Sequence, residues 1–352
     1  MTGVSGPAAF DELYDSAPDS PVLAELTDSV LLLTLHRPEV LNAWNGAMED
    51  RYMRLLEAAD DDPRVRAIVV TGAGRGFCTG ADMNGLKHVG ERTEADLIKP
   101  VPRDLPLHLR KPLIGAVNGV AAGLGMVQAL YFDVRFGSRD ARFTTAFARR
   151  GLIAEYGSSV LLTRMIGRSR AADLLLSGRM VGADEAHRIG LLDHVVDGPV
   201  AEAAVDYAAD IAAHCSPRSL AVIKRQLLHD DDFDYPSAAA RSETLMLESF
   251  HTADAAEGIG SHLERRPAEF PALPPARRRP QPRRRGPRRR PGRRLAVDPA
   301  GREQLSGPPG AIRTAPLTPV PHNPRPAQRD PAEENRCRSS PCPSAPRTCA
   351  PS

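Results

Sequence analysis

Short apolar runs alternate with segments of helical hydrophobic spacing over the first two hundred residues of the chain. The runs are rich in Val, Ile and Leu and have few polar interruptions, which is typical of strands buried on both faces. We predict strands at Val30–Leu35, Ala67–Thr71, Pro112–Val117, Val134–Gly137, Ala141–Thr144 and Leu191–Val196. The alternation with helices favours an α/β fold with a mainly parallel sheet.

The helical pattern becomes continuous toward the C-terminal side. Apolar residues three and four positions apart predict helices at Asn45–Ala59, Glu94–Leu109, Leu124–Leu130, Ser159–Ile166, Ser169–Leu176, Ala183–Ile189, Ala201–His214, Pro217–Leu228, Tyr235–Phe250 and Ala253–Arg265. We therefore expect a flexible N-terminus over residues 1–20, a strand–helix core over 21–200, and a helical region over 201–270.

The last part of the chain has a different composition. Residues 271–352 hold 18 Arg, no Lys, five acidic residues and 20 of the 33 prolines, and they contain no aromatic residue of the Phe, Trp or Tyr type. Such a segment buries too little apolar surface to offset the entropy of ordering, so we predict a disordered Arg/Pro-rich tail. The net charge of +2 therefore conceals a basic tail and a mildly acidic folded part.

Cysteines and leader-like segments exclude several classes of protein. Only Cys78 and Cys215 lie before the tail, which gives neither a disulfide framework nor the ligand spacing of a metal site. Met1–Ser20 is acidic and lacks the apolar centre of a signal peptide. Leu113–Phe136 is interrupted by polar residues, so it does not predict a membrane span. We expect a cytoplasmic protein without a metal.

Two glycine-rich turns carry the strongest chemical signal. Gly76–Met83 and Val117–Met126 each run from an apolar strand into a helix start, where backbone N–H groups lack intrahelical acceptors. Two such turns facing each other would bind a developing oxyanion. The dinucleotide fingerprint fails because its last glycine is replaced by Phe77, and neither a nucleotide phosphate loop nor a hydrolase nucleophile elbow is present.

Several motifs together resemble the crotonase superfamily, the enoyl-CoA hydratase/isomerase family, over roughly residues 22–270. The matching segments are His36–Ala43, Val69–Gly72, Phe77–Asp82, Lys111–Gly125, Leu175–Gly178, Ala183–Ala186, Gly190–Val196 and Asp254–Gly258. The resemblance implies a spiral of β-β-α units followed by a helical trimerisation region. It also implies a homotrimer or hexamer acting on a coenzyme A thioester, as in fatty acid metabolism, with coenzyme A as part of the substrate and no separate cofactor.

The resemblance also assigns site residues. The oxyanion donors fall on the backbone N–H groups of Ala81 and Leu124. The two glutamates of the best-known hydratases fall on Val127 and Phe147, whereas Glu155 occupies the place of the carboxylate in several family isomerases. Substrate contacts are expected at Arg37, Val40, Leu41, Ala43, Gly80, Asp82, Met83, Gly123, Val127, Phe147 and Tyr156.

A single acid/base residue favours movement of a double bond over ordinary hydration with two carboxylates. We therefore predict an enoyl-CoA isomerase that works through Glu155, with hydration through Glu155 and an activated water as the nearest variant. Two further hypotheses stay open. One is a catalytically weak acyl-CoA-binding protein. The other is non-specific nucleic-acid binding by the tail arginines. For the tail itself, we favour the interpretation that it extends past the family's usual end and has no function.

Overall fold

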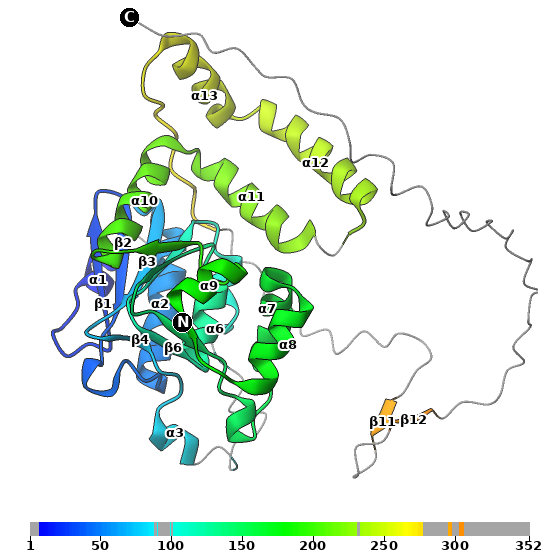
Figure 1. Ribbon diagram of the computed structural model, residues 1–352. Coiled ribbons are helices and arrows are strands. Elements are labelled where there is room, and N and C mark those ends of the chain that lie inside the picture. Colours follow the sequence, from blue (N-terminus) through cyan, green and yellow to red (C-terminus); the bar gives the residue numbers. More distant parts are fainter. Residues whose placement is uncertain are drawn as a thin grey trace, which may run out of the picture. The chain divides into compact units, whose positions relative to one another are not determined.

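The main part of the chain forms two sheets from strands that largely alternate along the sequence, and Figure 1 shows their ribbons. The computed structural model describes residues 7–87, 90, 99, 101–230, 233–276, 295–297 and 303–305. The chain divides into two compact units, residues 1–281 and 282–352. The sheets and the candidate site belong to the first unit.

The larger sheet has six strands in the order β1-β2-β3-β5-β7-β10. They are β1 (Val22–Thr27), β2 (Val30–Leu35), β3 (Ala67–Gly72), β5 (Leu113–Val117), β7 (Val134–Ser138) and β10 (His194–Val196). β1 pairs with β2 in antiparallel fashion, and every other pairing in this sheet is parallel. The prediction of a mainly parallel sheet is confirmed.

The smaller sheet has four short strands in the order β4-β6-β8-β9. They are β4 (Gly76–Cys78), β6 (Val120–Ala122), β8 (Arg142–Thr144) and β9 (Val181–Gly182). Along the chain, a strand of the larger sheet is followed by a strand of the smaller sheet and then by a helix. This order recurs at β3-β4-α3 and β5-β6-α6, so the chain advances as a spiral of β-β-α units.

Helices surround the sheets and then continue as a C-terminal series. Their bounds are α1 (Pro7–Tyr14), the 3-10 turn η1 (Pro38–Val40), α2 (Gly46–Asp61), α3 (Met83–Lys87), α5 (Leu105–His108), α6 (Leu124–Tyr131), the 3-10 turn η3 (Ala148–Arg150), α7 (Ser158–Ile166), α8 (Arg168–Ser177), α9 (Ala183–Ile189), α10 (Val200–His214), α11 (Pro217–His229), α12 (Tyr235–Phe250) and α13 (Ala253–Glu264). Among the described residues, no helix combines the length and apolar character needed to cross a lipid bilayer.

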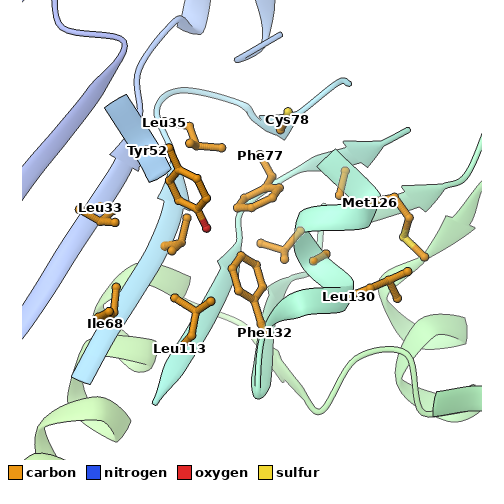
Figure 2. Close-up of a cluster of buried hydrophobic side chains, with 14 of the residues drawn as sticks. Leu33, Leu35, Tyr52, Ile68, Phe77, Cys78, Leu113, Met126, Leu130 and Phe132 are labelled. Carbon is orange, nitrogen blue, oxygen red and sulfur yellow. The ribbon is translucent and has the colours of Figure 1, made fainter. Parts of the chain in front are cut away.

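The larger sheet is covered on both faces, which explains why its strands are continuously apolar. On one face, Ile68 and Leu113 pack in a cluster with Tyr52, Phe77 and Phe132. Figure 2 shows these three rings between the strands and the helix that carries Met126 and Leu130. The Phe77 and Phe132 rings meet edge to face, with centroids 6.0 Å apart.

The opposite face of the larger sheet is covered by α10. Ala204 and Ala208 of this helix are completely buried, and they pack in one cluster with Val69 and Ile114 of the sheet. Small alanine side chains allow the helix backbone to approach the strands closely. Successive residues of each strand therefore contribute to two separate hydrophobic cores.

Several segments differ from the sequence-based expectation. The N-terminus is not uniformly flexible, because α1 buries Phe10 and Tyr14, at 4% and 7% exposure. The helix predicted over Glu94–Leu109 is present only at Leu105–His108 among the described residues, and residues 101–104 are not helical. The last predicted strand begins at His194 rather than Leu191, because the chain first turns after α9.

The second unit contains a short antiparallel pair that the sequence did not predict. β11 (Leu295–Val297) pairs with β12 (Glu303–Leu305). The rest of the tail beyond residue 276, including the arginine clusters, lies outside the described residues, so the prediction of disorder there is untested.

Candidate active site

The first glycine turn follows β4 and is fixed by a parallel bridge to Trp44. The Trp44 N–H donates to the Gly80 carbonyl at 2.7 Å, and the Asp82 N–H donates to the Trp44 carbonyl at 2.9 Å. This bridge uses the Gly80 carbonyl and the Asp82 N–H. Within the described residues the Ala81 N–H between them binds no acceptor, so the turn presents one backbone donor.

A preceding loop holds this turn through the buried side chain of Asn42. The Asn42 amide nitrogen donates to the carbonyls of Ala73 at 2.9 Å and Gly76 at 2.8 Å, and its oxygen accepts from the Arg37 N–H at 2.8 Å. The Arg37 guanidinium pairs with Asp82 at 2.9 Å. Arg37 and Asp82, predicted as substrate contacts, are thus engaged with each other in this structure.

The second glycine turn joins β6 to α6. The Gly123 N–H donates to the Thr144 carbonyl at 3.0 Å, and Gly123 has a φ of 51°. Leu124 is the first residue of α6, and the first turn of that helix closes from the Val127 N–H to the Gly123 carbonyl at 3.0 Å. The Leu124 N–H therefore has no intrahelical acceptor.

The two turns lie against each other because β4 pairs with β6 in parallel. A Cβ added at Gly80 would lie 2.7 Å from the Ala122 carbonyl oxygen and 3.4 Å from the Leu124 nitrogen. Gly80 also has a φ of 92°, where a side chain is strained. Among the described residues, neither the Ala81 nor the Leu124 N–H donates to a protein acceptor, so two adjacent turns each offer one donor.

A small pocket opens beside Leu124. It has room for about one water-sized sphere, roughly 10 Å³. Its lining residues are Trp44, Glu49, Met53, Arg103, Leu124, Val127, Gln128, Tyr131 and Tyr156. Three predicted site residues, Leu124, Val127 and Tyr156, are brought together here.

Other predicted contacts lie outside this lining. Val40, in η1, and Met83, at the start of α3, are 40% and 67% exposed. Leu41 instead supports the first glycine turn, because its carbonyl accepts from the Thr79 N–H at 3.2 Å. The Ala43 carbonyl accepts from the Arg37 guanidinium at 2.6 Å.

The two positions to which the family resemblance assigns the hydratase glutamates form a buried apolar patch. Val127 and Phe147 are 0% and 5% exposed and cluster with the ring of Tyr131. A carboxylate is absent from both positions, and the surroundings would disfavour an ionised one. Glu155 is half-buried in the loop before α7, and its carbonyl accepts from the Ser158 N–H at 3.0 Å.

The sequence analysis did not find two charged residues of the pocket, Glu49 and Arg103. Glu49 lies on α2 beside Met53, and it is only 7% exposed. A signal was available, since Glu49, Met53 and Leu56 follow helical spacing and place a carboxylate on an otherwise apolar face. Arg103 carried no such signal, because its contacts come from segments remote in sequence.

Lys111 and Lys224 are two lysines whose ammonium groups bind within the fold. The Lys111 ammonium is 2% exposed and donates to the carbonyls of Ala59 at 2.6 Å and Asp62 at 2.5 Å, which caps the end of α2. Burial lowers its pKa to about 8. Lys224 donates to the Lys111 carbonyl at 2.7 Å and pairs with Asp133 at 2.6 Å. Within the described ranges, no group of His, Cys, Asp and Glu side chains is arranged to hold a metal ion.

Known proteins share this arrangement over most of the chain. A family model described as enoyl-CoA hydratase/isomerase matches residues 25–272. The 1,2-epoxyphenylacetyl-CoA isomerase of Escherichia coli is 35% identical over 269 residues, covering 71% of this chain and 97% of that protein. The 2,3-dehydroadipyl-CoA hydratase of the same organism is 33% identical over 255 residues, covering 71% and 98%.

Solved structures agree with the sequence matches. The crystal structure of a probable enoyl-CoA hydratase/isomerase from Mycobacterium abscessus superposes with a TM-score of 0.65 at 32% identity, covering 72% of this chain and 99% of that one. A putative enoyl-CoA hydratase from Streptomyces coelicolor gives a TM-score of 0.65 at 30% identity, covering 77% and 99%. The chain has the crotonase fold and belongs to the enoyl-CoA hydratase/isomerase family.

Proposed function

We propose that this protein is an enzyme that moves the double bond of an enoyl-CoA thioester, with Glu155 as the acid/base. The observation that carries the proposal is the pair of adjacent turns whose Ala81 and Leu124 N–H groups lack protein acceptors. Such donors stabilise the negative charge that develops on a thioester oxygen when a neighbouring carbon loses a proton.

The reaction conserves all atoms of the substrate. The Glu155 carboxylate removes a proton from C4 of a 2-enoyl-CoA, and the C–H electron pair forms the C3–C4 double bond. The electron pair of the old C2–C3 double bond moves to C1–C2 and the carbonyl pair moves to the oxygen, so a dienolate forms with its oxygen on the two amides. The protonated Glu155 then returns the proton to C2, the carbonyl re-forms, and the product is a 3-enoyl-CoA. The same groups therefore catalyse the reaction in both directions.

The apolar patch at Val127 and Phe147 favours isomerisation over hydration. Hydration uses one group to activate water and another to deliver a proton, and these two positions supply neither. Among the Escherichia coli relatives, one is named as an isomerase of an epoxide and one as a hydratase, so the choice of isomerisation rests on these two positions and not on the names. The substrate class follows from the family, and the acyl group is left open.

The test compares Glu155→Gln with the wild type on 2-enoyl-CoA and 3-enoyl-CoA. The wild type is expected to interconvert them, and the variant is expected to lose at least about 10²-fold in kcat, the usual contribution of a positioned acid/base. Glu57→Gln, at an exposed position of α2, is the matched control and retains activity. Full activity of Glu155→Gln would remove Glu155 from the mechanism.

Water distinguishes the two reactions directly. Turnover in ¹⁸O-labelled water leaves an isomerised product unlabelled, whereas hydration places the label at C3. Label in the product would show that the enzyme hydrates the double bond and would contradict the proposed isomerisation. Tight acyl-CoA binding without turnover of either substrate would favour a binding protein.

We also propose that the C-terminal helices mediate self-association. Large apolar side chains on α11, α12 and α13 are exposed in the single chain, and α12 buries none of its residues. They include Ile223, Leu227, Met246, Leu247, Phe250, Ile259 and Leu263. An exposed apolar surface of this kind typically marks a protein interface. Light scattering of the purified chain should report a trimer or hexamer, and a concentration-independent monomer would contradict the proposal.

A further inference from the structure

The residue after Glu155 has an unusual backbone conformation. Tyr156 has a φ of 52°, in the left-handed region that an aromatic residue rarely adopts. Such a conformation persists only where the surrounding structure holds it, and it is found often at functional sites. The side chains that contact Tyr156 therefore help to fix the conformation of the loop that carries Glu155.

Two side chains from other elements hold Tyr156. The Tyr131 hydroxyl, on α6, donates to the Tyr156 carbonyl at 3.0 Å. Arg103 donates to the Tyr156 hydroxyl at 3.0 Å, and its guanidinium carbon lies 5.1 Å from the centroid of the Tyr156 ring. The same cation thus binds the hydroxyl and the ring face of one tyrosine, which restricts both its position and its orientation.

Arg103 is itself held by Glu49. Its Nε donates to one oxygen of the Glu49 carboxylate, and its Nη2 donates to the other oxygen at 3.1 Å. The two side chains are 21% and 9% exposed. A two-pronged contact between a planar guanidinium and a carboxylate fixes direction as well as distance. The ion pair therefore fixes the position of Arg103 as it contacts Tyr156.

The charges around Arg103 connect it to Glu155. The hydrogen bond to Glu49 is the main cause that raises the pKa of Arg103, and the charge of Glu155 acts in the same direction. The Arg103 cation and the Glu155 carboxylate therefore lie close enough for their charges to attract each other. Tyr131 also faces this group, and Asp104, paired with His108 at 3.5 Å, lies close enough to influence Tyr131.

We propose that Glu49 and Arg103 are a positioning pair that acts through Tyr156 to hold the Glu155 carboxylate in place. The inference rests on the proposed role of Glu155. Neither residue receives the transferred proton. Their effect is on the geometry of the residue that does.

The first variant is Arg103→Gln, which removes the cation. We expect kcat to fall by about 10- to 100-fold, as small misplacements of catalytic groups do, with KM little changed.

A second variant guards against loss of folding. Arg103→Gln alone leaves the Glu49 carboxylate buried without its partner, which is destabilising. The double variant Glu49→Gln with Arg103→Gln removes both charges and should fold, while retaining the loss of kcat. Arg103→Lys restores the charge without the two-pronged geometry, so it should recover only part of kcat.

The control is Arg54→Gln with Glu57→Gln, which removes a cation and a carboxylate from exposed positions of α2. It should leave kcat unchanged. Wild-type kcat in the Arg103→Gln and double variants would overturn the inference. So would a rise in KM alone, because that would make Arg103 a substrate contact.

The experiments distinguish a failure of the proposed function from a failure of the positioning role. If Glu155→Gln retains full isomerase activity, the role of Glu155 fails, and this inference fails with it. If Glu155→Gln is inactive while the Arg103 variants behave as wild type, the proposed function stands and only the positioning role is lost.

Discussion

The two halves of the candidate site are built in different ways. The half beside Ala81 and Leu124 consists of backbone, held by strand pairing and by the side chains of the buried Asn42 and the half-buried Asn118. The half around Glu155 consists of side chains, held by contacts among α2, α6 and the loop before α7. Backbone donors are placed by the fold as a whole, whereas the carboxylate depends on a few individual contacts.

This difference predicts opposite sensitivities. A substitution in the backbone half should matter only where it removes an N–H group or adds volume between the turns. A substitution in the side-chain half should lower activity wherever it removes one of the side chains that link Glu49, Arg103 and Tyr156. The following variants probe the two halves, beginning with the largest expected effect.

Leu124→Pro removes one backbone donor from the first position of α6, where proline is compatible with a helix. We expect kcat to fall by about 10²–10³-fold, the cost of losing one oxyanion donor. Leu124→Ala is the control, since it shortens the side chain and keeps the N–H. Circular dichroism should show the same helix content in both. Equal rates for the two variants would contradict the role of this amide.

Gly125→Ala tests the contact between the two turns. The new Cβ would lie 2.0 Å from the Cys78 carbonyl oxygen, so the backbone must shift. We expect the free energy of unfolding to fall by about 3 kcal/mol, at the upper end of overpacking effects. Gly260→Ala, on α13, meets no atom within 4 Å and should be neutral or slightly stabilising. Urea unfolding of both variants measures the difference.

The pH dependence of stability tests the burial of Cys78, which lies at the end of β4 in the backbone half. Burial raises its pKa to about 12. Above about pH 9 the unfolded chain loses this proton while the folded chain keeps it, so stability should fall by up to about 1.4 kcal/mol per pH unit from this residue. Denaturant unfolding at several pH values should show that Cys78→Ala reduces the decrease of the unfolding free energy with rising pH. Cys215→Ala, at a less buried position, should leave it unchanged.

Tyr131→Phe removes one contact from the side-chain half, the hydrogen bond to the Tyr156 carbonyl. We expect a loss of about 1 kcal/mol in stability, which is typical of one hydrogen bond, and a fall in kcat of a few fold. Tyr207→Phe, on α10, is the control at a partly exposed position. Thermal unfolding and the isomerase assay measure both. A loss of stability with unchanged kcat would separate this hydroxyl from the Glu155 loop.

The same division explains what the sequence could predict. The glycine turns were identified because their signal is local, as a strand, a glycine and a helix start that follow one another. The parallel sheet was identified because both of its faces are buried, which makes its strands continuously apolar. The contact of Arg103 with Glu49 joins residues far apart in the chain, and no local pattern encodes it. The short strands β4 and β6 were likewise missed, because their few residues resemble loops.

The apolar patch of Val127, Tyr131 and Phe147 has a stereochemical consequence for the proposed reaction. It offers no proton carrier on its own side of the acyl chain, so a single carboxylate would serve both carbons from one face. The hydrogen transfer would then be suprafacial. Part of a deuterium label at C4 should reappear at C2 in the same molecule instead of washing out into the solvent.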